Sequence, residues 1–317
     1  MKKTLLILAL LINTVWSKYL TPTLKIDVNE SIKDMVLVGS TLVMGTDGGK
    51  LKAYNLNEKK FTKIVQLPKI KDFMGDSIDT SVSSVDYLDG KYLMLSDSGI
   101  GGYSDLRINE NNKTINIFTE KDKLALVEAK FIDKDNILVA FLSDEAALYN
   151  LTNKKFIYRE QLNGSKFSNF ALNKDKTLAA FASESGEVIV IKPKSGKIIK
   201  RLTGINLDNI FKVDIKKDIV ATAGKDRRAG WYNLTTGKKD FIQAKFFIYA
   251  VSLSPDASMA AFAMDENNNI TIVKLSTKSK LFLLKGQNST LNNIIFKDKS
   301  TVFAASDDTF VSMWKLK

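Results

Sequence analysis

The sequence predicts an all-β fold, a β-propeller of seven four-stranded blades, and an internal repeat is the first observation behind this prediction. Each copy contains an apolar run, an acidic turn, a second apolar run and a polar turn. The acidic turns recur at intervals of 39 to 50 residues, at Asp47, Asp97, Asp144, Glu184, Asp226, Asp265 and Asp307. Seven such units fill nearly the whole chain as one ring, which overrides the two domains suggested by its 317 residues.

The second observation is the strand pattern inside a copy, which is clearest in the fourth. We expect an inner strand, a small and buried second strand, a third strand and an outer strand at residues 167–172, 177–182, 187–191 and 198–202. Turns rich in Asn, Asp, Ser and Gly separate these runs. The small residues of the second strand suit close packing between neighbouring blades.

The third observation concerns closure of the ring. The seventh copy reaches Lys317 after its third strand, and residues 23–28 read as a spare strand ahead of the first copy. We therefore predict that residues 23–28 complete the last blade and remove its open edge.

The first 17 residues are predicted to be a secretory signal peptide, and residues 18–317 a single propeller domain. Lys2 and Lys3 precede an apolar run over Thr4–Val15, and cleavage is expected after Ser17. The run is shorter than the roughly 20 residues of a membrane span. We therefore expect a periplasmic protein with no stable membrane span after processing, and the alternative is an uncleaved membrane anchor.

The amino-acid composition limits the kinds of active site and metal site that the chain can form. The chain has no Cys and no His, which excludes disulfides, thiol nucleophiles, Ser-His-Asp triads and His-ligated metal sites. We expect no enzymatic activity, no cofactor and no catalytic or metal-binding residue. The net charge of +12 would fit nucleic acid, but export favours acidic proteins or anionic lipid headgroups. Alternatively, scattered lysines only keep the surface soluble.

One candidate partner-binding patch lies on blades five and six. The loops before each inner strand and after each second strand should share one face of the ring. There they would bring together Lys225, Arg227, Arg228, Phe246, Phe247 and Tyr249. Arg and exposed aromatic side chains are common anchors of protein interfaces. The alternative is that Phe247 and Tyr249 alternate into the core while the arginines are only solvated.

The second copy is expanded on the same face. Residues 69–80 lengthen the loop before its inner strand, and the glycine-rich run 98–103 fills the following turn. A flexible binding loop and ordinary loop variation are the two interpretations. Asp76, Asp79 and Asp97 form a weak candidate for a cation site.

Two Asn residues are candidate N-glycosylation sites. Asn29 and Asn112 each begin an Asn-x-Ser/Thr motif with an acidic residue two positions earlier. This pattern resembles the extended acceptor sequence of bacterial periplasmic glycosylation systems.

Several turns resemble the WD40 family. The parallels are Ser-Pro-Asp at 254–256, Ser-Asp at 306–307 and Trp-Lys-Leu at 314–316. The Gly-His dipeptide of that family is missing, and its Trp-Asp pair is replaced by Tyr-Asn at 54, 149 and 232. The resemblance implies a divergent WD40-like propeller whose blades depend on apolar packing and turn chemistry.

The whole chain also resembles NapL-type accessory proteins of periplasmic nitrate reductase systems, in its leader, its single ring and its lack of Cys and His. That resemblance implies a monomeric, non-enzymatic interaction platform whose partners are nitrate reductase components. It would support maturation, assembly or electron delivery. The alternatives are a general periplasmic or outer-membrane protein assembly propeller, and a small-ligand-binding propeller.

Overall fold

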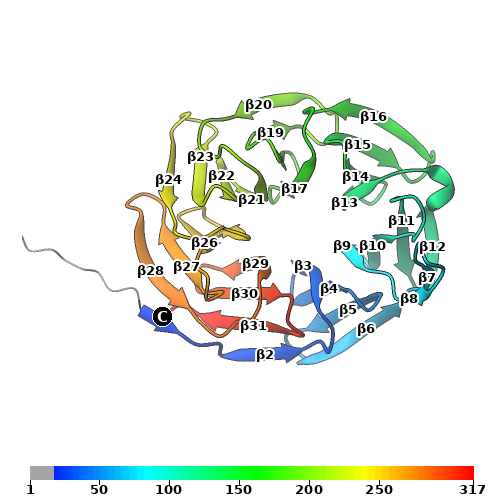
Figure 1. Ribbon diagram of the computed structural model, residues 1–317, viewed down its shortest axis with the longest axis horizontal. Coiled ribbons are helices and arrows are strands. Elements are labelled where there is room, and N and C mark those ends of the chain that lie inside the picture. Colours follow the sequence, from blue (N-terminus) through cyan, green and yellow to red (C-terminus); the bar gives the residue numbers. More distant parts are fainter. Residues whose placement is uncertain (1–17) are drawn as a thin grey trace, which may run out of the picture.

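The structure, a computed structural model, describes residues 18–317 and is a closed ring of seven small sheets (Figure 1). The predicted seven-bladed β-propeller is therefore confirmed. The predicted signal peptide, residues 1–17, lies outside the described residues.

Each blade orders its strands from the ring axis outward. The first three blades are β3 (Ile32–Val38), β4 (Thr41–Thr46), β5 (Lys50–Asn55), β6 (Lys60–Gln66); β9 (Val82–Leu88), β10 (Lys91–Asp97), β11 (Ser104–Glu110), β12 (Lys113–Phe118); and β13 (Leu126–Asp133), β14 (Asn136–Phe141), β15 (Glu145–Asn150), β16 (Lys155–Gln161). The fourth and fifth are β17 (Phe167–Leu172), β18 (Ala179–Ser183), β19 (Val188–Ile191), β20 (Ile198–Leu202); and β21 (Ile210–Lys216), β22 (Ile219–Gly224), β23 (Arg228–Asn233), β24 (Lys239–Gln243). The last two are β25 (Val251–Leu253), β26 (Met259–Ala263), β27 (Ile270–Lys274), β28 (Ser279–Leu284); and β29 (Leu291–Asp298), β30 (Thr301–Ser306), β31 (Phe310–Lys315).

The fourth blade follows the predicted pattern, with its inner and outer strands at the expected residues. Its second strand starts later than predicted, at Ala179, because the preceding turn is longer. In that turn the Asn173 side chain accepts a hydrogen bond from the Leu178 N–H at 2.9 Å. Two further bonds, backbone to backbone, fix Lys176 and Asn173 in the same turn.

Closure of the ring occurs as predicted. Strand β2 (Leu24–Asp27) pairs antiparallel with β31 and supplies the fourth strand of the last blade. The structure adds one pairing that the sequence did not indicate. Strand β1 (Lys18–Leu20) runs parallel to β28 as a fifth strand of the sixth blade. The first two strands of the described residues therefore join the sixth blade to the seventh (Figure 1).

The hydrophobic core is divided into seven apolar clusters, and each cluster lies between two neighbouring blades. The second strands supply the small residues expected there: Ala179, Ala180 and Ala182 of β18 have no exposed surface. Small side chains let adjacent sheets approach closely enough for larger residues, such as Phe181, to fill the remaining space.

The residues that resemble WD40 turns have structural roles. Trp314 is fully buried, and its indole N–H donates to the Lys285 carbonyl at 3.0 Å, which ties the last blade to the connection before it. Asp256 accepts from the Ser254 hydroxyl at 2.7 Å and from the Ser258 N–H at 3.2 Å, so it closes its own turn.

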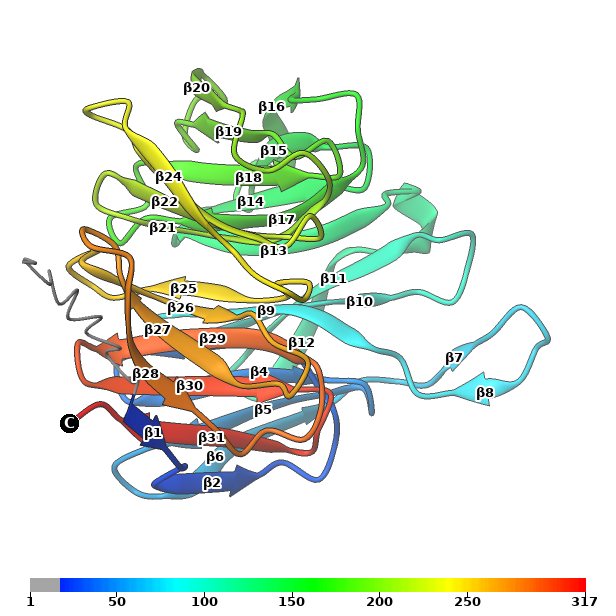
Figure 2. The same cartoon turned by 60° about the vertical axis from the view of Figure 1, so that its left-hand side comes forward.

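The connections divide between the two faces of the ring. Those before each inner strand and those between second and third strands share one face, as predicted, and the remaining turns form the other. A short hairpin, β7 (Ile70–Lys71) and β8 (Ser77–Ile78), projects from the first of these faces (Figure 2). The one helix is a 3-10 turn, η1 (Glu120–Asp122), so nothing in residues 18–317 is a helix long and apolar enough to cross a membrane.

Candidate functional site

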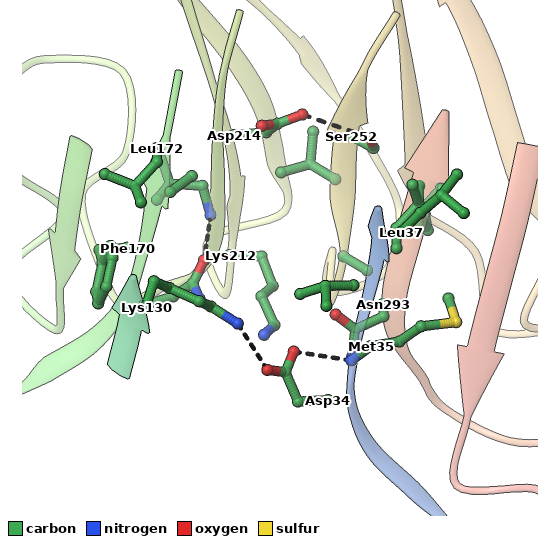
Figure 3. A pocket seen from close by; sticks show the side chains of 18 of the residues that line it. Asp34, Met35, Leu37, Lys130, Phe170, Leu172, Lys212, Asp214, Ser252 and Asn293 are labelled. Atoms are coloured by element: carbon green, nitrogen blue, oxygen red, sulfur yellow. Dashed lines mark hydrogen bonds and ion pairs between the residues drawn. The ribbon is translucent and has the colours of Figure 1, made fainter. Parts of the chain in front are cut away.

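The central channel is lined by residues from the inner strands of all seven blades (Figure 3). Its free volume is about 320 Å³. Sequence reasoning missed this wall. The available signal was a polar or charged residue recurring on successive inner strands, such as Asp34, Asp86 and Asp214, where alternation alone would place only apolar residues on buried positions.

Polar side chains of the wall link every blade to the next. In six links a side chain accepts a hydrogen bond from an inner-strand N–H of the following blade: Asp34 from Val85 (2.9 Å), Asp86 from Phe131 (2.8 Å), Glu128 from Phe170 (3.0 Å), Asn169 from Val213 (3.0 Å), Asp214 from Leu253 (2.8 Å) and Ser252 from Phe296 (3.4 Å). The seventh link joins the last blade to the first, where the Asn292 amide donates to the Ile32 carbonyl at 2.9 Å. The links form a closed circle around the channel.

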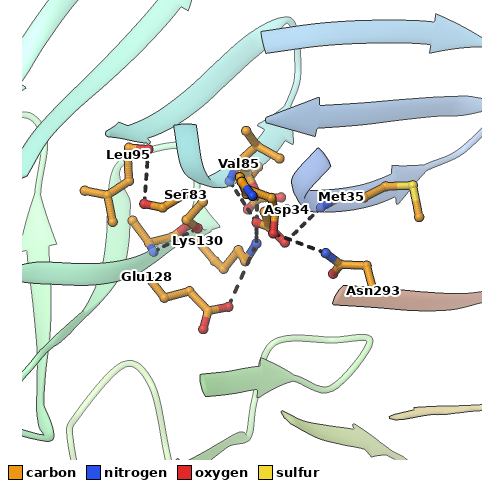
Figure 4. A network of polar contacts seen from close by, with 12 residues as sticks. Asp34, Met35, Ser83, Val85, Leu95, Glu128, Lys130 and Asn293 are labelled. Atoms are coloured by element: carbon orange, nitrogen blue, oxygen red, sulfur yellow. Dashed lines mark hydrogen bonds and ion pairs between the residues drawn. The ribbon is translucent and has the colours of Figure 1, made fainter. Parts of the chain in front are cut away.

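An ion pair reinforces this circle. The Lys130 ammonium lies 2.8 Å from the Asp34 carboxylate and donates to the Val85 carbonyl at 2.8 Å (Figure 4). Burial alone would raise the pKa of Asp34, but Lys130, Lys212 and the Val85 N–H outweigh it and hold that pKa below its usual value. Burial alone would lower the pKa of Lys130, but the surrounding carboxylates raise it. The pair therefore stays ionised.

The wall thus acts mainly as a brace. Its carboxylates are occupied by backbone N–H groups, and within the described chain no group of three or more acidic residues is placed to hold a metal ion. Lys176 and Lys212 both line the channel without an ion pair to a described residue. Lys176 donates to the Phe131 carbonyl at 2.6 Å, and the charge of Lys212 favours the ionised forms of Asp34 and Glu128.

Charge divides the two faces of the ring. The face with the β7–β8 hairpin, here called the acidic face, comprises the connections before inner strands and those between second and third strands. Its connections contain nine basic residues and sixteen acidic ones: Glu30, Asp47, Asp72, Asp76, Asp79, Glu120, Asp122, Asp144, Glu184, Glu187, Asp208, Asp226, Asp265, Glu266, Asp307 and Asp308.

The opposite face is called here the lysine face. Its connections contain six acidic residues and thirteen lysines: Lys59, Lys134, Lys154, Lys174, Lys176, Lys192, Lys194, Lys197, Lys217, Lys238, Lys278, Lys299 and Lys317. The sequence-based alternative that lysines are simply scattered does not describe these connections.

Exposed apolar side chains gather on the acidic face. Of the thirteen large apolar residues that are exposed within residues 18–317, seven lie in its connections: Phe73, Met74, Ile78, Ile100, Leu142, Leu207 and Phe247. Phe73 and Met74, at the hairpin tip, are 94% and 73% exposed. Among the described residues, the lysine face has only Val38, at the end of β3, and the other five lie on outer strands and β1.

The predicted aromatic patch forms on the acidic face. The rings of Phe246, Phe247 and Tyr249 have centroids 5.6 to 6.2 Å apart, and Phe211 stacks on Tyr249 at 5.2 Å. The alternative that Phe247 points into the core is wrong, because Ile248 has no exposed surface and Phe247 is 38% exposed. Sequence reasoning missed Phe211, which comes from the preceding inner strand.

The basic residues predicted for this patch divide by role. Lys225 and Arg227 are exposed at the turn between β22 and β23. The Arg227 carbonyl accepts from Ala244 at 2.8 Å, which fixes this turn to the aromatic segment. Arg228 is half-buried: it donates to the Ile205 carbonyl at 2.6 Å and stacks over Phe241. It therefore ties the third strand of this blade to the preceding loop and to the outer strand.

The expanded second blade is ordered. Its long loop forms the β7–β8 hairpin, and the Asp72 carboxylate caps the hairpin tip by accepting from the N–H groups of Met74 and Asp76 at 2.9 Å. The glycine-rich run is closed by the Ser98 hydroxyl, which donates to the Tyr103 carbonyl at 2.8 Å. Asp76, Asp79 and Asp97 do not meet as a cation site in the described structure.

The acidic turns differ sharply in their surroundings. Asp226 accepts from the Asn206 amide at 3.0 Å and from the Leu207 N–H at 2.9 Å, so it braces the neighbouring loop. Asp144 is 2% exposed, and its Oδ1 has no hydrogen-bond partner among the described residues. Burial, with repulsion from Glu187, raises the pKa of Asp144 to about 7.

Both candidate glycosylation residues lie in exposed turns. Asn29 has φ of 60° between β2 and β3, and Asn112 has φ of 62° in the turn between β11 and β12. Their side chains are accessible, and modification stays a prediction.

No protein-family model matches this chain, and comparison with curated proteins found no match.

Proposed function

We propose that this protein is a non-enzymatic interaction platform of the periplasm, accessory to maturation, assembly or electron delivery of a periplasmic nitrate reductase. The observation that carries the platform role is the concentration of exposed apolar and aromatic side chains on the acidic face. Aromatic clusters flanked by arginine are frequent energetic centres of protein interfaces. The nitrate reductase partner and the periplasmic location rest on the resemblance and on the leader sequence.

The surrounding structure suits such a surface. Phe246, Phe247 and Tyr249 are held by hydrogen bonds from Ile248 and Ala244 to the turn of the fifth blade. A patch that is already rigid loses little conformational freedom on binding. The hairpin tip with Phe73 and Met74 stands beyond the ring on the same face, where it would extend the contact.

The direct test of the patch is a pull-down from the periplasmic fraction. Phe246→Ser combined with Phe247→Ser should reduce capture of reductase subunits by roughly tenfold or more. The matched control is Ile157→Ser with Ile199→Ser, which removes two exposed apolar residues from outer strands and should leave capture unchanged. Equal capture by wild type and the patch variant would reject this surface.

The test of the biological role is a deletion strain. Nitrate reductase activity and cofactor loading of its catalytic subunit should both fall, and unchanged values would reject the reductase role while leaving the platform role open.

One observation favours an assembly propeller as the second candidate. Strand β1 pairs parallel to β28, so the outer edge of a blade accepts a short additional strand. A client strand would use the same chemistry at another outer edge. Capture of barrel-assembly components instead of reductase subunits in the same pull-down would favour this candidate.

A further inference from the structure

We propose that the lysine face docks on an anionic lipid surface, which leaves the acidic face directed away from the membrane. This inference is independent of the partner proposed above, because it concerns the opposite side of the ring.

The first argument is the segregation of charge. Thirteen lysines and six acidic residues occupy the connections of the lysine face, whereas acidic residues dominate the other face. Keeping a protein soluble requires net charge but not its separation between two faces. A dipolar ring instead has one orientation in which it approaches an anionic plane favourably.

The second argument is that the basic residues of the lysine face are all lysines and lack aromatic neighbours in its connections. The connections of the lysine face contain no arginine and no aromatic residue, and Val38 is the single exposed large apolar side chain on this face within residues 18–317. Protein interfaces and nucleic-acid sites favour arginine and aromatic anchors. Lysines on exposed turns act as mobile point charges, which matches diffuse attraction to phospholipid headgroups.

The third argument is that several lysines of the lysine face form no ion pair. On the fourth blade Lys174, Lys192 and Lys197 are exposed and form no ion pair with described residues, and Lys217 and Lys238 of the fifth blade share this state. Free lysines on adjacent blades act together when they lie within a Debye length of the membrane surface.

The path of the chain gives a fourth argument. The Lys18 ammonium donates to the Lys317 carbonyl at 2.7 Å, so the described chain starts beside the lysine face. The apolar run Thr4–Val15 precedes it in the sequence. A leader still attached to the membrane would therefore hold this same face toward the bilayer.

The test is binding to vesicles of phosphatidylglycerol and phosphatidylcholine, compared with vesicles of phosphatidylcholine alone. Residues 18–317, which contain every strand of the ring, are used beside the full chain, because the leader can bind vesicles by itself. We expect binding that requires phosphatidylglycerol and weakens steeply as salt rises. Lys174→Glu with Lys192→Glu and Lys197→Glu should weaken it on the order of 100-fold or more.

The matched control reverses three exposed lysines of the acidic face, Lys121, Lys123 and Lys245, and changes the net charge equally. It should alter binding by less than about threefold, since these charges lie beyond a Debye length from the docked face. No binding of the wild type, or equal loss in both variants, would overturn the proposal. Tighter binding to a DNA duplex than to vesicles at equal phosphate concentration would also overturn it and assign the face to nucleic acid.

Discussion

The inner wall of the channel and the acidic face both contain many carboxylates, but they use them differently. In the wall, Asp34 receives two backbone N–H groups and a lysine, and its pKa is held below the usual value although burial alone would raise it. On the acidic face, Asp144 is as buried as Asp34 but lacks such donors, and its pKa rises to about 7. Burial alone therefore does not fix the state of a carboxylate. Lys130 and the backbone donors outweigh it at Asp34, whereas burial prevails and raises the pKa of Asp86, although that carboxylate also accepts from two backbone N–H groups.

This comparison also separates structure from function in the molecule. The polar side chains of the wall form hydrogen bonds between neighbouring blades, so they stabilise the closed ring. The faces expose aromatic, apolar and charged side chains that the ring does not need. Changes in the wall should consequently alter stability, and changes on the faces should alter binding.

The largest effect is expected from Asp34→Ala. It leaves Lys130 without its nearest carboxylate and the Val85 N–H without its acceptor, and the free energy of unfolding should fall by about 3–5 kcal/mol. Denaturant titration measures the loss. Asp34→Asn should lose less stability than Asp34→Ala, because the amide oxygen can still accept from the Val85 N–H. A loss below about 1 kcal/mol would show that the wall is not a brace.

Asp144→Asn should have an intermediate and pH-dependent effect. The folded pKa of Asp144 lies near 7 and the unfolded value near 4, so the folded protein binds the extra proton between these values. This group therefore lowers stability progressively as pH rises from about 4 to about 7, and the loss is complete above that range.

The variant removes this titration. At pH 8 it should be more stable than wild type by roughly 2 kcal/mol, with little difference at pH 4. Asn also tolerates the φ of 60° at this position. Unfolding curves at several pH values measure the difference, and the absence of histidine keeps other ordinary titrations out of the range from pH 5 to 8. Parallel pH profiles for variant and wild type would contradict the assignment.

The smallest effect on stability is expected from Phe247→Ser. Its ring is 38% exposed and packs mainly on other residues of the patch, so the free energy of unfolding should change by about 0.5 kcal/mol or less. The same denaturant titration checks this. A loss above about 2 kcal/mol would make Phe247 a core residue and weaken its assignment to a binding surface.

The sequence was informative where a local pattern repeats. Acidic turns and small second strands predicted the blades and their number, because both depend on turn chemistry and alternation within about forty residues. The spare strand at 23–28 predicted closure of the ring, because the seventh copy lacks a fourth strand. It also placed Phe246, Phe247 and Tyr249 on the correct face. The predicted start of β18 at residue 177 was wrong, since the strand begins at Ala179 after a turn that closes through an Asn173 side-chain hydrogen bond, which no local pattern marks.

Other features joined residues far apart in the chain. The link from Asp34 to Val85 spans 51 positions, and the one from Asn292 to Ile32 spans 260. Phe211 and Tyr249 stack across two blades, and β1 reaches β28. None of these contacts leaves a local pattern, because they depend on the curvature with which seven sheets close.

The sequence by itself therefore determined the repeating unit and the number of blades, since these follow from short-range hydrogen bonding and hydrophobic alternation. It also identified the closing strand, because the seventh copy lacks a fourth strand and a spare one precedes the first copy. Only the tertiary structure decided how charge is distributed. Neighbouring strands of a blade run in opposite directions, so successive turns lie on opposite faces of the ring. Lysines that look scattered along the chain therefore gather on one face. The same closure brings the inner strands together, where their polar side chains replace solvent as partners for the neighbouring backbone.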